Sequence, residues 1–157
     1  MAVRYAEGRL FTEEDMLKKY GDIPVYAFNF VDYILWKNRE ELGRKYKGVK
    51  FDHFKFAYRR SIEHWFPQHP NSDEKIEKMD DQFLHSFGNL CIITDSQNSK
   101  FGNLVPSAKY KQWEGIFDRQ SLKLQIVANI TEKTKWESYQ IKGLEKEILP
   151  MVKRFIE

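Results

Sequence analysis

A chain of 157 residues, of which 41% are hydrophobic and 15% aromatic, can bury one core but has little room for a second. Charged residues make up 31% and are mixed in sign, which argues against global disorder, and the net charge of +3 permits a polyanionic partner without demanding one. The single cysteine, Cys91, excludes an internal disulfide, the lack of a CxxC pair argues against a structural zinc knuckle, and no apolar run approaches a membrane span. We therefore expect a soluble, cytoplasmic, single-domain protein of residues 1–157 with no membrane partner and a buried free thiol.

Two helices are expected in the first 50 residues. Thr12 and the acids that follow it are typical of a helix N-terminus, and Gly21 is typical of a C-cap. Residues 23–43 carry apolar side chains at mixed helical spacing and end at Gly43, which favours a second helix. The aromatic start of this segment leaves a strand open there.

A strand, a loop and a second strand follow. Aromatic residues alternate with polar or small ones over residues 54–58, which predicts a strand that ends near His64. Residues 67–82 are polar, contain two prolines and predict a long loop with room for one helical turn; such loops are usually functional or disordered. Residues 88–94 are short, apolar and β-branched, which predicts the second strand.

The rest of the chain predicts helices. One begins near Asn98 and is interrupted around Pro106. Residues 121–130 and 134–157 predict C-terminal helices; a capping box opens the second of them, and Pro150 should break or kink it.

Three blocks of the central unit carry residues capable of chemistry. Glu63 and His64 stand side by side at the end of the first predicted strand, Asn89 opens the second, and Asn98 follows it. The order of these residues resembles the HNH (ββα-metal) nuclease motif. The extended blocks resemble the C-terminal domain of GmrSD-type, modification-dependent restriction endonucleases; they are "SIEHWFPQ" (61–68), "GNL" (88–90) and the segment from "NSKFGN" to "KY" (98–110).

This resemblance implies a fold, an activity and partners. The expected fold is a mostly helical α+β domain with an embedded ββα-metal strand–loop–strand–helix unit at residues 51–113, between N-terminal helices at 1–50 and C-terminal helices at 114–157. The implied activity is metal-dependent DNA cleavage or nicking in a restriction or anti-phage system, with Mg²⁺ or Mn²⁺ as cofactor. The family implies coupling to a ParB-like nucleotide-hydrolysing domain that senses modified DNA. The sequence contains no P-loop, so this chain would be the cleaving part only.

The chemistry of the residues supports the same roles. Imidazole titrates near neutral pH, so His64 can act as a general base if its other nitrogen donates to a fixed acceptor. Glu63 is a hard oxygen ligand suited to Mg²⁺ or Mn²⁺, and Asn98 offers a neutral second ligand. Side chains alternate along a strand, so Glu63 and His64 converge on one metal-sized gap with Asn98 only if the strand ends or bends there, as Pro67 suggests. Asn89 more plausibly holds the backbone of the Glu63–Pro67 loop than touches substrate.

Each of these residues also has a plain structural alternative. His64 could be a satisfied histidine at a strand end, Glu63 could pair with a neighbouring arginine, and Asn89 could be a turn residue. Asn98 could be a helix N-cap. His53, His69 and His85 fall outside the matched blocks, and Trp113 and Trp136 are assigned to packing. Lys100, Lys109 and Lys111 could neutralise DNA phosphates or form a solvated helix face.

Two other functions stay open. The chain could be a DNA-binding or assembly module on an inactive HNH scaffold, although the presence of the acid, the base and the Asn ligand weighs against this. It could also be an HNH enzyme that cleaves RNA, which no residue excludes. The modification or sequence that is targeted, the choice between nicking and double-strand cleavage, and the oligomeric state do not follow from the sequence.

Overall fold

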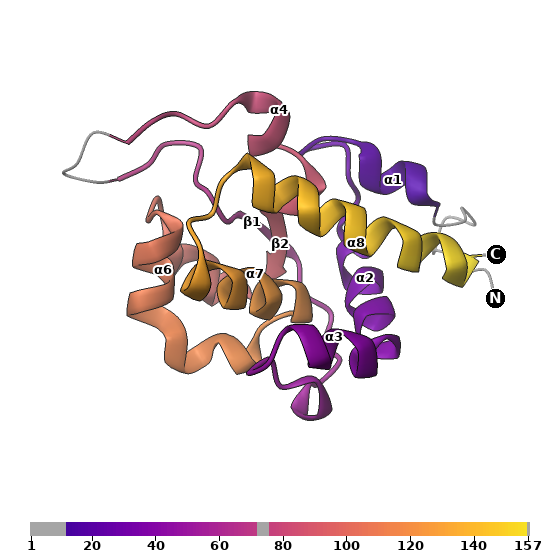
Figure 1. The fold of residues 1–157 in the computed structure, drawn as a ribbon. Coiled ribbons are helices and arrows are strands. Elements are labelled where there is room, and N and C mark those ends of the chain that lie inside the picture. Colours follow the sequence, from indigo (N-terminus) through magenta and orange to yellow (C-terminus); the bar gives the residue numbers. More distant parts are fainter. Residues whose placement is uncertain (1–11, 72–75, 157) are drawn as a thin grey trace.

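The computed structural model describes residues 12–71 and 76–156, and it shows the expected mostly helical α+β fold with one small antiparallel sheet (Figure 1). Two strands, β1 and β2, form that sheet. The elements with their bounds are α1 (Glu13–Leu17), α2 (Val25–Lys37), α3 (Arg39–Lys45), β1 (Ser61–His64), α4 (Asp81–Leu84), β2 (Leu90–Ile93), α5 (Asp95–Phe101), α6 (Pro106–Trp113), α7 (Leu122–Lys133) and α8 (Ser138–Ile156). Short 3-10 turns lie between them: η1 (Phe51–His53), η2 (Phe87–Asn89) and η3 (Glu114–Arg119).

The β1–β2 hairpin lies at the centre of the molecule (Figure 1). The strands pair antiparallel, with Ser61 opposite Ile93 and His64 opposite Leu90. Helices α2 and α7 contact β2, α5 contacts β1, and α8 contacts the η2 turn that leads into β2. All four residues of β2 are buried, and α2 and α7 both pack against it, which explains why its sequence is continuously apolar.

The first strand is much shorter than the sequence predicts. Residues 54–60 are not part of a strand, and β1 begins only at Ser61. The aromatic alternation is misleading here because it does not mark a buried face: Phe54 is buried, whereas Phe56 and Tyr58 are 54% and 62% exposed. Without a neighbouring strand in the described residues, this segment makes no ladder, so period-2 patterning alone does not produce a strand.

The N-terminal helices follow the expected pattern with different bounds. Thr12 caps α1 in a capping box with Asp15, and α1 ends at Leu17, before Gly21, whose φ is +97°. The expected helix over 23–43 divides at Asn38 into α2 and α3, because the Asn38 side chain donates to the Ile34 carbonyl at 2.8 Å and competes with the helical ladder. The aromatic start of this segment is helical.

Two caps differ from expectation. The hydroxyl of Thr94 accepts from the backbone N–H of Gln97 at 3.3 Å and caps α5, so Asn98 is not an N-cap. The expected capping box of Thr134 and Glu137 is wrong: Thr134 ends α7, and the N–H of Glu137 donates to the Gln140 side chain at 3.0 Å. This bond makes Glu137 the N-cap of α8, which begins at Ser138.

Of the break or kink expected at Pro150, the break is wrong. The helix runs through it to Ile156. Buried apolar residues on both sides of the proline, from Ile141 to Val152, pack against α1, α2 and α4. This packing outweighs the hydrogen bond that a proline removes, since tertiary contacts supply most helical stability in proteins.

Buried side chains from α1 to α8 form one hydrophobic core, which includes Cys91 as the expected buried free thiol. Phe28 and Phe87 stack in it at 5.5 Å between ring centroids, and Trp65 donates from Nε1 to the Thr131 hydroxyl at 2.8 Å. Within residues 12–71 and 76–156, the search for a helix that is both long and apolar enough to cross a bilayer finds none. The core therefore fixes the hairpin from several directions.

Candidate active site

His64 is the last residue of β1 and is buried, with 6% of its surface exposed. Its Nε2 atom lies 3.1 Å from Nδ1 of His85, and its Nδ1 atom lies 3.4 Å from the side-chain nitrogen of Gln68. The ring of Tyr20 packs edge-on against the imidazole, with centroids 4.5 Å apart. Segments far apart in the sequence therefore fix the orientation of His64.

The partners of His64 indicate which ring nitrogen carries the proton. The amide nitrogen of Gln68 can only donate, so Nδ1 of a neutral His64 accepts. Nε2 then carries the proton and donates to Nδ1 of His85. Gln68 is exposed and its contact is long, so the Nδ1 lone pair is the one available to a reacting water.

The surroundings keep His64 neutral. Its pKa is lowered to about 4, first by burial and then by the charges of His85 and Lys109. At pH 7 the imidazole is therefore unprotonated, which is the state that a general base needs. His85 itself is held in place by its backbone, since its carbonyl accepts from the N–H of Tyr20 at 2.8 Å.

Glu63 is buried and paired with Lys109 of α6. The ammonium of Lys109, which is fully buried, donates to Oε1 of Glu63 at 2.8 Å and to the carbonyls of His64 and Trp65 at 2.6 and 2.7 Å. Burial raises the pKa of Glu63 and lowers that of Lys109, and their mutual attraction opposes both shifts. All three protons of the ammonium are used.

The expected phosphate contact of Lys109 is therefore wrong. A lysine with no exposed surface and no free proton cannot neutralise a DNA phosphate. Its role here is to hold the end of β1. Lys100 and Lys111, by contrast, are exposed, and the Lys100 ammonium lies 5.8 Å from the centroid of the Trp113 ring.

The side chains of Glu63 and His64 do not share partners. β1 stays regular through His64, which pairs with Leu90, so successive side chains leave on opposite faces. Glu63 points to Lys109 on α6, and His64 points to His85 beside α4. Among the described hydrogen bonds, none joins Glu63 to His64 or either of them to Asn98.

Asn98 lies on α5, which is aligned along β1. At one end of α5, the Ser61 hydroxyl donates to Asp95. At the other end, the rings of Phe101 and Trp65 meet with centroids 6.0 Å apart. Asn98 lies between these two contacts along α5, and its side chain is exposed, whereas Gln97 and Phe101 are the buried residues of the helix.

Asn89 is fully buried and holds the loop after His64. Its Oδ1 accepts from the N–H of Phe66 and from Nε1 of Trp136, both at 2.9 Å. Its Nδ2 donates to the carbonyls of Phe66 and Leu84 at 3.0 and 2.9 Å. Its donors and acceptor are used on the protein itself, which suits a residue that positions the loop and leaves none for substrate.

The motif does not identify two residues that contact His64 and Asn89. His85 lies outside the matched blocks, and Trp136, assigned to packing, also donates to Asn89. Both come from elements that reach the hairpin only in the folded chain, so spacing along the sequence carries no signal for them. Within the described residues, no three His, Cys, Asp or Glu side chains gather as a metal site.

Comparison with known proteins agrees with this layout. The family model described as GmrSD restriction endonucleases, C-terminal domain, matches residues 12–150, which is most of the chain. No curated protein matches the chain, and neither does any solved structure. The proteins of this family are restriction-type nucleases that act on DNA. The chain belongs to the family of C-terminal domains of GmrSD restriction endonucleases.

Proposed function

We propose that this chain is a metal-dependent DNA endonuclease domain of a restriction or anti-phage system, with His64 as its general base. The observation that supports this is the state of His64: a neutral imidazole whose Nε2–H is bound by His85 and whose Nδ1 lone pair faces the exposed Gln68. General-base catalysis requires a fixed acceptor whose lone pair reaches the attacking water, which here takes the place of the long contact from Gln68.

The donor set for a metal is small but chemically suitable. Oε1 of Glu63 is taken by Lys109, and its other oxygen makes no hydrogen bond among the described residues; Asn98 adds an exposed amide oxygen. Two oxygen donors fit Mg²⁺ or Mn²⁺, which keep most of their waters and bind substrate phosphates. The ion would neutralise charge on the phosphate and the leaving oxygen.

The protein's own groups would divide the remaining work. Nδ1 of His64 would remove the proton from the attacking water, and His85 would hold the ring through Nε2–H. A pKa near 4 makes His64 a weak base when the domain is free, and the negative charge of a bound phosphate raises the pKa of a nearby imidazole. Asn89 would keep the loop at Phe66 in place, and Lys100 and Lys111 are exposed for phosphate contacts.

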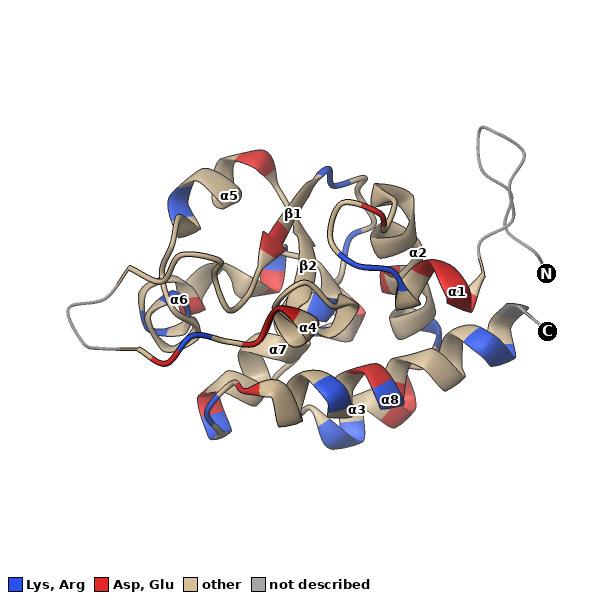
Figure 2. Ribbon diagram, turned by 90° about the horizontal axis from the view of Figure 1, so that it is seen from above, with Lys and Arg blue, Asp and Glu red and all other residues tan. Residues whose placement is uncertain are grey.

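The domain would depend on a partner for targeting. Acidic and basic residues are both spread over its elements (Figure 2), and the net charge is only +3. Such a surface binds DNA weakly and with strong salt dependence. A ParB-like nucleotide-hydrolysing domain or subunit that senses modified phage DNA in the cytoplasm would supply the affinity.

The test is a supercoiled-plasmid assay with Mg²⁺ or Mn²⁺ on wild type, His64→Ala and Asn98→Ala. Wild type should convert the plasmid to nicked or linear DNA, and His64→Ala should lose about 10²–10⁴-fold in rate, the usual contribution of a general base. Asn98→Ala should need more metal for the same rate. Equal cutting by wild type and His64→Ala would remove His64 as the base.

The same assay separates the alternatives. A wild type that binds but never cuts DNA or RNA, with or without a ParB-like partner, would indicate an assembly module. Cutting of RNA in preference to DNA would move the substrate to RNA. Cutting in EDTA would contradict the metal requirement.

A further inference from the structure

Partly exposed aromatic rings form a continuous surface over α2, residues 54–60 and the end of α8. Tyr33 of α2 has its ring centroid 6.3 Å from that of Trp36 and 6.0 Å from that of Phe56. Phe56 also meets Trp36 at 5.5 Å, and Phe155 of α8 meets Tyr33 at 5.7 Å. We call this the aromatic surface, and its rings are those of Phe30, Tyr33, Trp36, Phe56, Tyr58 and Phe155.

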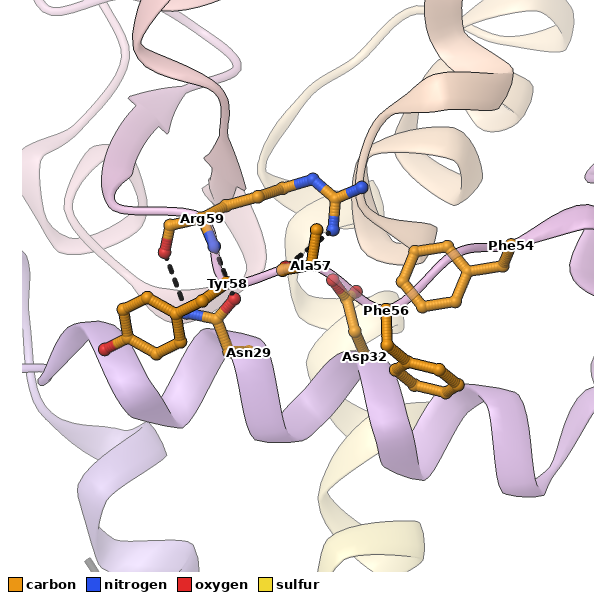
Figure 3. Close-up of a pocket in the computed structure, with 7 residues that line it drawn as sticks. All are labelled: Asn29, Asp32, Phe54, Phe56, Ala57, Tyr58 and Arg59. Atoms are coloured by element: carbon orange, nitrogen blue, oxygen red, sulfur yellow. Dashed lines mark hydrogen bonds between the residues drawn. The ribbon is translucent and has the colours of Figure 1, made fainter. Parts of the chain in front are cut away.

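Residues 54–60 contribute the most accessible rings of this surface. Phe56 and Tyr58 are 54% and 62% exposed, and both lie on the α2 side of the segment (Figure 3). The Asn29 side chain fixes the segment there, because it accepts from the N–H of Arg59 at 2.9 Å and donates to its carbonyl at 2.8 Å (Figure 3). A contiguous patch of exposed apolar side chains usually marks a binding site, whereas a single one does not.

Basic residues are concentrated around the aromatic surface. The stretches that supply its rings, 30–39, 54–60 and 150–155, contain seven basic residues and a single acidic one, the buried Asp32. The rest of the chain has 19 basic and 22 acidic residues, so the positive excess of the protein comes from these stretches. Such a charge distribution favours a polyanionic partner. The exposed basic residues that border the rings are Lys37, Lys55, Arg60, Lys153 and Arg154.

The rings and the charges together favour an unpaired nucleic acid strand. Aromatic side chains stack on bases whose faces are free, which excludes the stacked interior of a duplex, while nearby cations follow the phosphates. Arg39 illustrates this mixture, since its guanidinium lies 4.1 Å from the centroid of the Trp36 ring and pairs with the exposed Asp52 at 3.7 Å. Interfaces between proteins are instead poor in lysine, whereas lysines of three separate stretches border these rings.

We infer that the aromatic surface binds an unpaired DNA strand, with bases stacked on Phe56 and Tyr58 and without a preference among them. The inference rests on the proposed action on DNA and adds the kind of DNA to it, a strand that is unpaired beside the phosphate at His64. Residues 54–60 lead directly into β1, and His64 follows Tyr58 by six positions, so the two lie at most about 22 Å apart. Fewer than about ten nucleotides span this distance, since each rises about 3.4 Å even when stacked.

The test is binding of the whole chain to labelled oligothymidine, to an abasic strand of the same length and to the duplex of oligothymidine with oligodeoxyadenosine, measured by fluorescence anisotropy in EDTA. The wild type should bind oligothymidine more tightly than the abasic strand by roughly 5- to 100-fold, as stacking of one base provides. Tyr58→Ala and Phe56→Leu should lose most of this ratio and keep the wild-type affinity for the duplex. Leucine retains an apolar side chain against Trp36, so the second variant removes the ring and preserves the packing.

The cations have a separate readout in the salt dependence of oligothymidine binding. The slope of log Kd against the logarithm of the salt concentration changes by about 0.7 for each phosphate that a protein neutralises on a single strand. Lys55→Gln and Arg60→Gln should therefore each lower the slope by about 0.7, whereas Tyr58→Ala should leave it unchanged.

Tyr139→Ala and Lys133→Gln are the matched controls, because both side chains are exposed and lie outside the aromatic surface. Both should keep the wild-type ratio and slope. Equal affinity of the wild type for oligothymidine and the abasic strand, no measurable binding to oligothymidine, or an unchanged ratio in both ring variants would overturn the inference. An unchanged ratio together with loss of partner-dependent plasmid cleavage would make the surface a protein interface instead.

The two proposals fail in different ways. Ring-dependent binding of oligothymidine without any plasmid cleavage would remove the proposed nuclease and keep the strand-binding surface. Plasmid cleavage by a wild type that does not distinguish oligothymidine from the abasic strand would keep the nuclease and remove the surface.

Discussion

Lys109 shows how one ammonium group can organise the end of a strand. It is fully buried and neutralises Glu63 while it binds the carbonyls of His64 and Trp65. Replacing it leaves a buried carboxylate without a partner charge and two carbonyls without a donor. Both losses act on the backbone that presents His64.

We expect Lys109→Met to lower the free energy of unfolding by about 3–5 kcal/mol, the usual effect of breaking a buried ion pair. Urea denaturation monitored by tryptophan fluorescence measures this. Lys100→Met is the control, because Lys100 is exposed and should change stability by no more than about 0.5 kcal/mol. A change of less than about 1 kcal/mol for Lys109→Met would show that the pair is replaceable.

His85 contacts the ring of His64, so under the proposed function it is a positioning residue. We expect His85→Ala to lower kcat of plasmid cleavage by about 10- to 100-fold, as loss of a supporting hydrogen-bond partner usually does, with KM little changed. His85→Gln should recover part of the rate because its amide oxygen can accept from Nε2–H of His64.

The exposed His53 lies outside the site and offers a control for His85. His53→Ala should cleave at the wild-type rate. Equal rates for His85→Ala and His85→Gln, or a rise in KM alone, would argue against a positioning role.

At the scale of elements, the η2 turn is wedged against α8. A Cβ atom on Gly88 would lie 2.6 Å from the backbone carbonyl of Ile141 and 2.9 Å from Cγ of Glu145. The N–H of Gly88 also donates to Glu145 at 2.8 Å. Glycine is required here because of close approach between two backbones.

We expect Gly88→Ala to destabilise the fold by about 1–3 kcal/mol or more, because α8 or the hairpin must move to admit one methyl group. Gly143→Ala is a matched control on α8, the helix that Gly88 approaches: nothing lies within 4 Å of its added Cβ, so it should raise stability by about 0.5–1 kcal/mol. Thermal unfolding of both variants measures the contrast. Similar melting temperatures for the two would contradict the wedge.

The elements differ in how far the sequence predicts them. Local signals place α1, the hairpin strands at 61–64 and 90–93, and the loop between them, because caps, apolar runs and prolines act over a few residues. Pro150 and the aromatic run at 54–58 mislead, since packing on α8 overrides the proline and no strand lies beside the aromatic run in the described residues. The partners of His64 are not predictable in this way, because His85 and Tyr20 reach it through the fold alone.

For the whole molecule, several ionisable groups lie inside the core rather than on the surface. Asp32 and Lys123 are buried beside each other, and Arg59 lies near them. Burial raises the pKa of Asp32 to about 7, although Arg59 and Lys123 oppose the shift. The stability of the fold must therefore depend on pH through this residue.

An acid whose pKa is raised from 3.8 to about 7 on folding keeps its proton in the folded state while the unfolded chain loses it. Its contribution is thus complete below pH 3.8 and falls as pH rises toward 7, by an upper bound of about 4 kcal/mol. We expect the free energy of unfolding of wild type, minus that of Asp32→Asn, to decrease over this range in urea titrations. A difference that is flat or increases with pH would contradict a raised pKa.

The hydrogen bonds from Trp136 to Asn89 and from Gly88 to Glu145 also bear on the order in which the protein is made. A ribosome releases residues 61–110, with every letter of the nuclease motif, well before it releases Trp136 and Glu145. Until those residues have been made, Asn89 lacks its hydrogen bond from Trp136, and the η2 turn lacks its close packing of Gly88 against α8. A nascent chain that has released residues 61–110 alone therefore carries the matched blocks without the ordered loop, which is complete only once Trp136 and Glu145 have also left the ribosome.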